Sequence, residues 1–173
     1  MMYFLRAAMV VGTFWLALLS PPAHAQASKH DCAIFYMGAG GYMFAAALST
    51  RADEFRRANP KAYVDIRHHW STAAVPVCKN PLIVGHSLGA IKAVKVGNAL
   101  RKGRVISIDP PDWYTRAYGL RANQPTMNFF HCPASPYGCG RVSGSAQNVD
   151  LSKEGLTHVF LPYSRTIARE VMR

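Results

Sequence analysis

The sequence feature that most constrains the fold is a serine that glycines flank on both sides. Ser87 stands two residues after Gly85 and two residues before Gly89, which gives the pattern Gly-x-Ser-x-Gly. An apolar run at 81–84 precedes this pattern, and helical spacing over 90–102 follows it. A strand that turns sharply into a helix needs residues without bulk at the two glycine positions. The pattern therefore predicts that Ser87 has a strained backbone and projects its hydroxyl above the carboxyl end of a strand.

The rest of the chain alternates between apolar runs and helical patterns. Apolar runs predict strands at 32–36, 63–66, 81–84, 105–108 and 126–130. Helical spacing predicts helices over 42–58, 90–102 and 163–173. Such alternation is typical of the α/β class. We therefore expect a three-layer sandwich, with a mostly parallel sheet of about five to six strands and helices on both faces.

The first 25 residues have the pattern of an export signal. Arg6 precedes an apolar run over 7–19, and the small-x-small pattern Ala23-His-Ala25 follows. The apolar run is shorter than the roughly 20 residues that a membrane-spanning helix needs. We therefore expect a signal peptide over 1–25, a single domain over 26–173, and export to the periplasm or beyond. The alternative is an uncleaved N-terminal anchor helix.

The composition excludes a disordered polyelectrolyte, because 50% of the residues are hydrophobic and only 17% are charged. The formal net charge of +11 nevertheless favours anionic partners. The basic residues that gather on two expected helices and at their ends are Lys92, Lys95, Arg101, Lys102, Arg104, Arg51, Arg56 and Arg57. They are either solvated helix faces or a surface that is attracted to an anionic envelope. Nucleic acid is not an expected partner, because no binding motif is present.

The four cysteines would persist as disulfides in an oxidising compartment. Cys132 and Cys139 flank a loop rich in proline and glycine, which makes a local bridge plausible and would pair Cys32 with Cys78. The sequence alone permits three connectivities. No CxxC pair is present and the spacings match no zinc site, so no metal is expected.

The segment Gly85–Ala90, Gly-His-Ser-Leu-Gly-Ala, resembles the nucleophile elbow of the α/β-hydrolase superfamily, particularly of its lipase and esterase branches. The resemblance covers most of 26–173 in the order of elements. It implies a small α/β-hydrolase fold that lacks the first strands of a full-sized member. Malonyl-type acyltransferases share the start of this segment, but their domains are much larger.

The resemblance also implies a catalytic triad in the order serine, acid, histidine, with Ser87 as the nucleophile. Asp109 directly follows the run 105–108 and precedes two prolines, which is similar to the lipase-like position of the acid. Asp112 is a nearby substitute, and Asp150 could serve from a later loop.

His158 lies in a late loop before the C-terminal helix, which is similar to the position of the family's catalytic histidine. The other histidines fit this role less well. His86 belongs to the elbow itself and cannot reach Ser87 as its general base, and His131 is next to an expected disulfide. His30, His68 and His69 lie too early in the chain.

Two backbone N–H groups are candidates for the oxyanion hole. One belongs to Leu88, at the start of the helix after Ser87. The other belongs to Ala39, because the glycine-rich segment 37–41 resembles the family's oxyanion loop. Alternatively, these glycines only form a tight turn or bind a phosphate. They do not complete Gly-x-Gly-x-x-Gly, because position 43 is Met, so no dinucleotide cofactor is expected.

Together these features predict a secreted serine hydrolase that needs no cofactor and cleaves small-molecule or lipid acyl esters through an acyl-enzyme. Thioester and amide hydrolysis use the same constellation, so the substrate and the oligomeric state stay open. No long insertion precedes His158, which favours an open site and small or surface-accessible esters. The alternative is a catalytically inactive α/β-hydrolase-like binding module.

Overall fold

The structure is a computed structural model that describes residues 29–41, 45–132 and 139–173. The expected export signal over 1–25 lies outside the described residues and stays a prediction. Within the described part of the chain, no helix combines the length and apolar character that crossing a membrane requires.

A six-stranded sheet forms the middle layer, in the order β2-β1-β3-β4-β5-β6. The strands are β1 Cys32–Met37, β2 Tyr63–His68, β3 Pro81–His86, β4 Arg104–Ile108, β5 Arg121–Phe130 and β6 Ser143–Asp150. Every neighbouring pair is parallel. The carboxyl ends of all six strands therefore meet at one edge of the sheet, where ligands bind in open α/β sheets.

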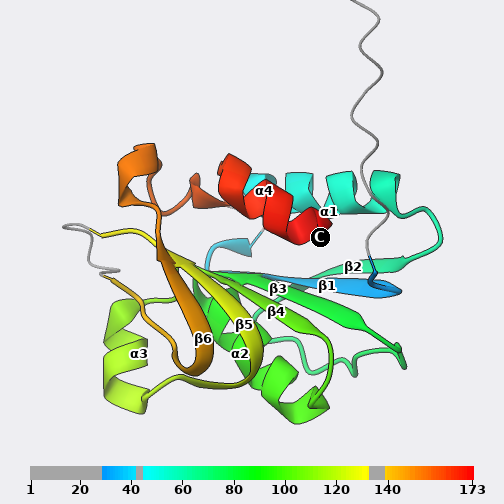
Figure 1. Ribbon diagram of the computed structural model, residues 1–173, viewed down its shortest axis with the longest axis horizontal. Coiled ribbons are helices and arrows are strands. Elements are labelled where there is room, and N and C mark those ends of the chain that lie inside the picture. Colours follow the sequence, from blue (N-terminus) through cyan, green and yellow to red (C-terminus); the bar gives the residue numbers. More distant parts are fainter. Residues whose placement is uncertain (1–28, 42–44, 133–138) are drawn as a thin grey trace, which may run out of the picture.

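Helices cover both faces of this sheet (Figure 1). The helices α1 Ala46–Ala58 and α4 Arg165–Met172 lie on one face, and α2 Leu88–Leu100 and α3 Asp112–Tyr118 lie on the other. The side chains of β1 alternate between the two layers, because Phe35 packs with the α1 and α4 side whereas Ile34 and Tyr36 pack with α2. The predicted three-layer α/β fold is confirmed.

Five strands and three helices lie where the apolar patterns predict them, with ends that differ by a few residues. The helix α3 was not predicted, because its seven residues are too few to show a periodicity. Its ends carry recognisable signals nevertheless. Asp112 pairs with Arg116 over 2.6 Å, and Gly119 ends the helix with a φ of 59°.

The edge strand β6 was also not predicted, because it is polar and mostly exposed. Side-chain amides help to hold it, in addition to the ladder with β5 and the apolar contacts of Ala146 and Val149. The amide of Asn128, which is fully buried in β5, donates to Asn148 Oδ1 and to the Gly140 carbonyl oxygen, over 2.8 Å in each case. The Asn148 amide in turn donates to the Val142 carbonyl oxygen over 2.8 Å.

Both disulfides are present, in the pairing that the local-bridge argument favours. Cys32–Cys78 joins the start of β1 to the segment before β3, and Cys132–Cys139 joins the end of β5 to the segment before β6. Loop-closure entropy alone gives stabilisations of about 4 kcal/mol for the longer loop and about 2.5 kcal/mol for the shorter one.

Candidate active site

The turn from β3 into α2 is built around two close backbone contacts. A Cβ atom at Gly85 would overlap the Gly89 carbonyl group, and a Cβ atom at Gly89 would overlap the carbonyl oxygen of Tyr36 in β1. Ser87 lies between these glycines with a φ of 58° and a ψ of −126°. This is the strained conformation that the sequence predicts, and it costs about 1–3 kcal/mol in a residue other than glycine.

Hydrogen bonds to the neighbouring strands hold this strained segment. The Ser87 N–H donates to the carbonyl oxygen of Ile108 in β4 over 2.9 Å. The next residue of that chain segment, Asp109, also has a positive φ, of 48°, and its N–H donates to the Phe129 carbonyl oxygen over 2.6 Å. The parallel ladder thus continues past the strand ends and fixes both Ser87 and Asp109.

The structure brings Asp109 and His158 together. His158 Nδ1 lies 2.7 Å from Asp109 Oδ2, and the Asp109 side chain is only 1% exposed. Asp109 Oδ1 also accepts a hydrogen bond from the His131 backbone N–H over 3.2 Å. The His131 ring lies nearby, with its Nδ1 4.0 Å from Asp109 Oδ2.

The other two candidate acids have different partners. Asp112 pairs with Arg116 within α3. Asp150, at the end of β6, accepts hydrogen bonds from the Ser152 hydroxyl and backbone N–H over 2.5 and 2.8 Å. These bonds to Ser152 lower the pKa of Asp150.

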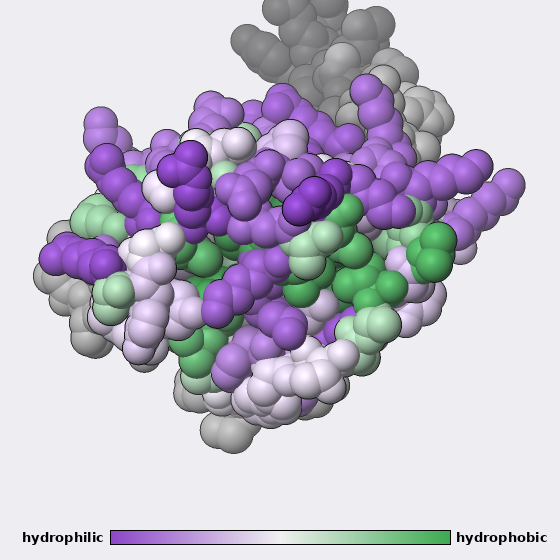
Figure 2. Space-filling model, turned by 90° about the horizontal axis from the view of Figure 1, so that it is seen from below, coloured by the Kyte–Doolittle hydropathy of each residue, from purple (hydrophilic) through white to green (hydrophobic). Residues whose placement is uncertain are grey.

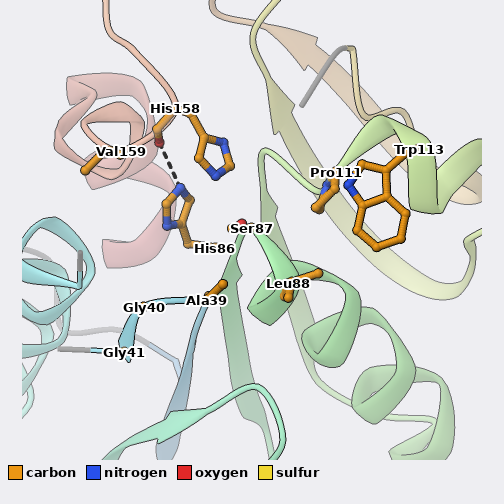
Figure 3. Close-up of a pocket in the computed structure, with 11 residues that line it drawn as sticks. Ala39, Gly40, Gly41, His86, Ser87, Leu88, Pro111, Trp113, His158 and Val159 are labelled. Carbon is orange, nitrogen blue, oxygen red and sulfur yellow. Dashed lines mark hydrogen bonds between the residues drawn. The ribbon is translucent and has the colours of Figure 1, made fainter. Parts of the chain in front are cut away.

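His86 supports the backbone of His158. Its Nε2 lies 2.8 Å from the His158 carbonyl oxygen, and the two rings are 4.7 Å apart (Figure 3). Burial lowers the pKa of His86 to about 3, and the nearby His158 ring adds to this shift, whereas the backbone hydrogen bond opposes it. His86 is therefore neutral near pH 7. Because a carbonyl oxygen only accepts, the His86 proton sits on Nε2.

A pocket of about 340 Å³ opens at this edge of the sheet, and both Ser87 and His158 line it (Figure 3). Leu88 and Ala39, which carry the two predicted oxyanion donors, line it as well. The Gly38 turn approaches the serine closely, since a Cβ atom there would lie 2.7 Å from Ser87 Cβ.

Sequence reasoning missed the apolar side of this pocket. Pro111, Trp113 and Val159 line it, and the Trp113 side chain, on α3, is 53% exposed. The prolines and the helix-end signals of α3 place this element directly after Asp109, so these signals could have found Trp113.

One group of possible metal ligands occurs among the described residues, namely Asp31, Cys32 and Cys78. Both thiols form the disulfide, so neither is available as a thiolate. The Asp31 carboxylate accepts hydrogen bonds from the backbone N–H groups of Lys79 and Asn80, which lower its pKa. Its donor atoms are thus already engaged in holding the segment before β3.

Comparisons with known proteins support the fold. No protein-family model and no curated protein matches this chain. It is similar to the solved structure of Est1E from Butyrivibrio proteoclasticus, at 12% identity and a TM-score of 0.51, over 82% of this chain and 85% of that one. Another similar structure is an alpha-beta serine hydrolase homologue from Coxiella burnetii, at 11% identity and a TM-score of 0.48, over 82% of each chain. The sheet order, the elbow and the first of these likenesses define an α/β-hydrolase fold.

Replacing His86 by glutamine should make the protein less sensitive to acid. An ordinary histidine has a pKa of 6.5, whereas folded His86 has a pKa of about 3. Between these two pH values the unfolded chain binds a proton at this residue and the folded chain does not. The free energy of unfolding therefore falls as the pH falls through this window. Glutamine does not titrate, and its amide can still donate to the His158 carbonyl oxygen. Urea unfolding at pH 7 and pH 5 should give a loss that is about 2 kcal/mol smaller in His86→Gln than in the wild type.

Gln147→Asn, on the exposed strand β6, removes no titratable group and is the control, so it should keep the pH dependence of the wild type. Equal pH dependence in His86→Gln and the wild type would contradict the buried neutral state of His86.

Proposed function

We propose that this protein is a serine hydrolase that cleaves acyl esters through an acyl-enzyme. The hydrogen bond of 2.7 Å between His158 Nδ1 and Asp109 Oδ2, beside a pocket that Ser87 and His158 share, carries this proposal. A nucleophile, a base and a group that orients the base are the three parts that such chemistry requires. The α/β-hydrolase fold adds support, because its elbow presents the serine at the sheet edge.

In the proposed mechanism, Ser87 Oγ attacks the carbonyl carbon of the ester while His158 Nε2 takes the hydroxyl proton. Asp109 keeps the proton of the neutral ring on Nδ1 and stabilises the imidazolium that forms. The bond to the alcohol then breaks, and His158 gives its proton to the leaving oxygen. Water attacks the acyl-enzyme with the same base, which releases the acid and restores Ser87.

The developing oxyanion would accept hydrogen bonds from the backbone N–H groups of Leu88 and Ala39. Leu88 supports this role because it begins α2, and the first amides of a helix have no acceptor within the helix. The partial positive charge of the helix start acts in the same direction. The close approach of the Gly38 turn to Ser87 supports Ala39 as the second donor.

A fluorophosphonate probe should label the wild type and leave Ser87→Ala unlabelled. Asp109→Asn should slow labelling by about 10⁴-fold, because an amide cannot hold the correct histidine tautomer. Asp112→Asn and Asp150→Asn are matched controls at the other two candidate acids and should label within a few-fold of the wild type. In-gel fluorescence gives the labelling rate of each of these variants and of the wild type.

Absence of Ser87-dependent labelling would favour the second candidate, a catalytically inactive α/β-hydrolase-like binding module. Strong slowing in Asp150→Asn with normal labelling of Asp109→Asn would instead move the acid role to Asp150.

The substrate class that fits best is a small acyl ester. A volume of about 340 Å³ is near the lower end for ligand pockets, and apolar residues line one side of it. Among p-nitrophenyl esters, kcat/KM should be highest for short acyl chains and fall for long ones. Trp113→Ala should lower kcat/KM for the preferred ester by about tenfold, through a higher KM, because it removes an apolar wall. A sharp rise in activity only above the critical concentration of a long-chain lipid would contradict this preference.

We also propose that the protein is exported, which the two disulfides support because they persist in oxidising compartments. The N-terminal sequence of protein recovered from the periplasm or medium should begin at Gln26. A sequence that begins upstream of Ala23 would contradict cleavage at the expected site.

Attraction to an anionic envelope surface is part of this proposal, although ion pairs within the protein engage several of its basic residues. Arg51, Arg56 and Arg104 form ion pairs with Glu54, Asp53 and Glu170. On the side of α2 and α3, hydrophilic side chains cover much of the surface and extend across its middle, where hydrophobic patches lie between them (Figure 2). The remaining basic residues of α2 and its end, Lys92, Lys95, Arg101 and Lys102, would make the electrostatic contribution.

A further inference from the structure

One segment beside the Cys132–Cys139 disulfide contacts the candidate acid, and the segment on the other side contacts the residue that follows this acid. His131, the residue before Cys132, donates its backbone N–H to Asp109 Oδ1 over 3.2 Å. Because this bond uses Oδ1, it orients the carboxylate group so that Oδ2 faces His158 Nδ1. The position of the His131 backbone therefore sets the direction in which Asp109 faces.

The other end of the bridge packs against Pro110, the residue after Asp109. Gly140, which follows Cys139, lies so close to Pro110 that a Cβ atom at Gly140 would overlap the Pro110 carbonyl oxygen. Pro110 directly follows Asp109 in the chain. The Gly140 carbonyl oxygen accepts a hydrogen bond from the buried Asn128 amide, which fixes this contact to β5.

Hydrogen bonds also hold the Cys132 end. The Cys132 N–H donates to Ser152 Oγ over 2.6 Å, and that hydroxyl donates to Asp150 at the end of the exposed strand β6. The disulfide is the covalent link that keeps the His131 segment and the Gly140 segment together around Asp109.

We propose that the Cys132–Cys139 disulfide is a positioning device for Asp109, so that its reduction lowers the rate of catalysis without unfolding the protein. The reduction is a thiol–disulfide exchange in which a dithiol supplies two electrons and two protons, becomes a disulfide, and leaves two thiols at Cys132 and Cys139. The inference rests on the proposed function, because it assigns the effect to the orientation of the triad acid.

The second disulfide provides a matched control. Cys32–Cys78 closes a longer loop, with a sequence separation of 46 against 7, so its loss should destabilise the fold more. It joins β1 to the segment before β3, and no hydrogen bond or ion pair described above connects it to Asp109 or His158. Removal of Cys132–Cys139 should therefore lower activity more than stability, and removal of Cys32–Cys78 should lower stability more than activity.

The test compares Cys132→Ser/Cys139→Ser with Cys32→Ser/Cys78→Ser. In the first variant, kcat for a short p-nitrophenyl ester and the rate of fluorophosphonate labelling should fall about 100-fold, with KM nearly unchanged. In the second variant both rates should stay within a few-fold, although urea unfolds it at a lower concentration. Equal rates in the two variants, or a loss that only follows the loss of stability, would overturn the proposal.

Two further measurements test the positioning role even if a variant folds poorly or the ester is not hydrolysed. Titration of the wild type with dithiothreitol should lower the labelling rate in step with reduction of Cys132–Cys139, as mapped by mass spectrometry. The proton NMR signal of the His158 Nδ1–H, shifted downfield by its bond to Asp109, should weaken in Cys132→Ser/Cys139→Ser and persist in the control. An unchanged signal in both variants would overturn the positioning role, whereas absence of Ser87-dependent labelling in the wild type would overturn only the proposed function.

Discussion

The contact between the β3–α2 turn and β1 is the constraint on which the rest of this site depends. Gly89 lies against the carbonyl oxygen of Tyr36 so closely that no side chain fits between them. This contact lets α2 begin directly above the neighbouring strand, and it forces Ser87 into its positive φ. The same parallel register then supplies acceptors for the strained segment, because the N–H groups of Ser87 and Asp109 bond to the ends of the next strands. A shift of β4 by one residue would displace both side chains at once.

The sequence predicts most of the sheet because its central strands are buried on both faces. β1 and β3 are continuous apolar segments, so a simple run of hydrophobic residues identifies them. The strand β6 has no such run, and it is held by its ladder with β5 and by a bond between Asn128 and Asn148, which lie 20 residues apart. No local pattern reports a contact of that kind. Tertiary hydrogen bonding, rather than β-propensity, decides that this polar segment is a strand.

The residues of the candidate site also differ in whether the local sequence or only tertiary contacts identify them. Ser87 was predictable because the glycines that permit its conformation are adjacent in the sequence. Asp109 and His158 could be proposed from the order of elements and the family resemblance, with Asp112 and Asp150 left as alternatives for the acid. Only the three-dimensional register brings one acid to within 2.7 Å of the His158 ring. The His131 backbone was missed because its place beside Asp109 follows from how the end of β5 packs, which no motif records. Trp113 was missed although the prolines and the helix-end signals place α3 directly after Asp109.

The two sides of the site are stabilised by different physical means. On the side of Ser87, buried strands and glycine contacts leave little space, so steric fit and the backbone bond to Ile108 together determine where Ser87 lies. On the side of Asp109, the strand β6 is exposed but the end of β5 is buried. A directional hydrogen bond from the His131 backbone to Asp109 and a short disulfide next to His131 add to that packing. Directional and covalent links of this kind respond to chemical conditions more readily than a close-packed core does.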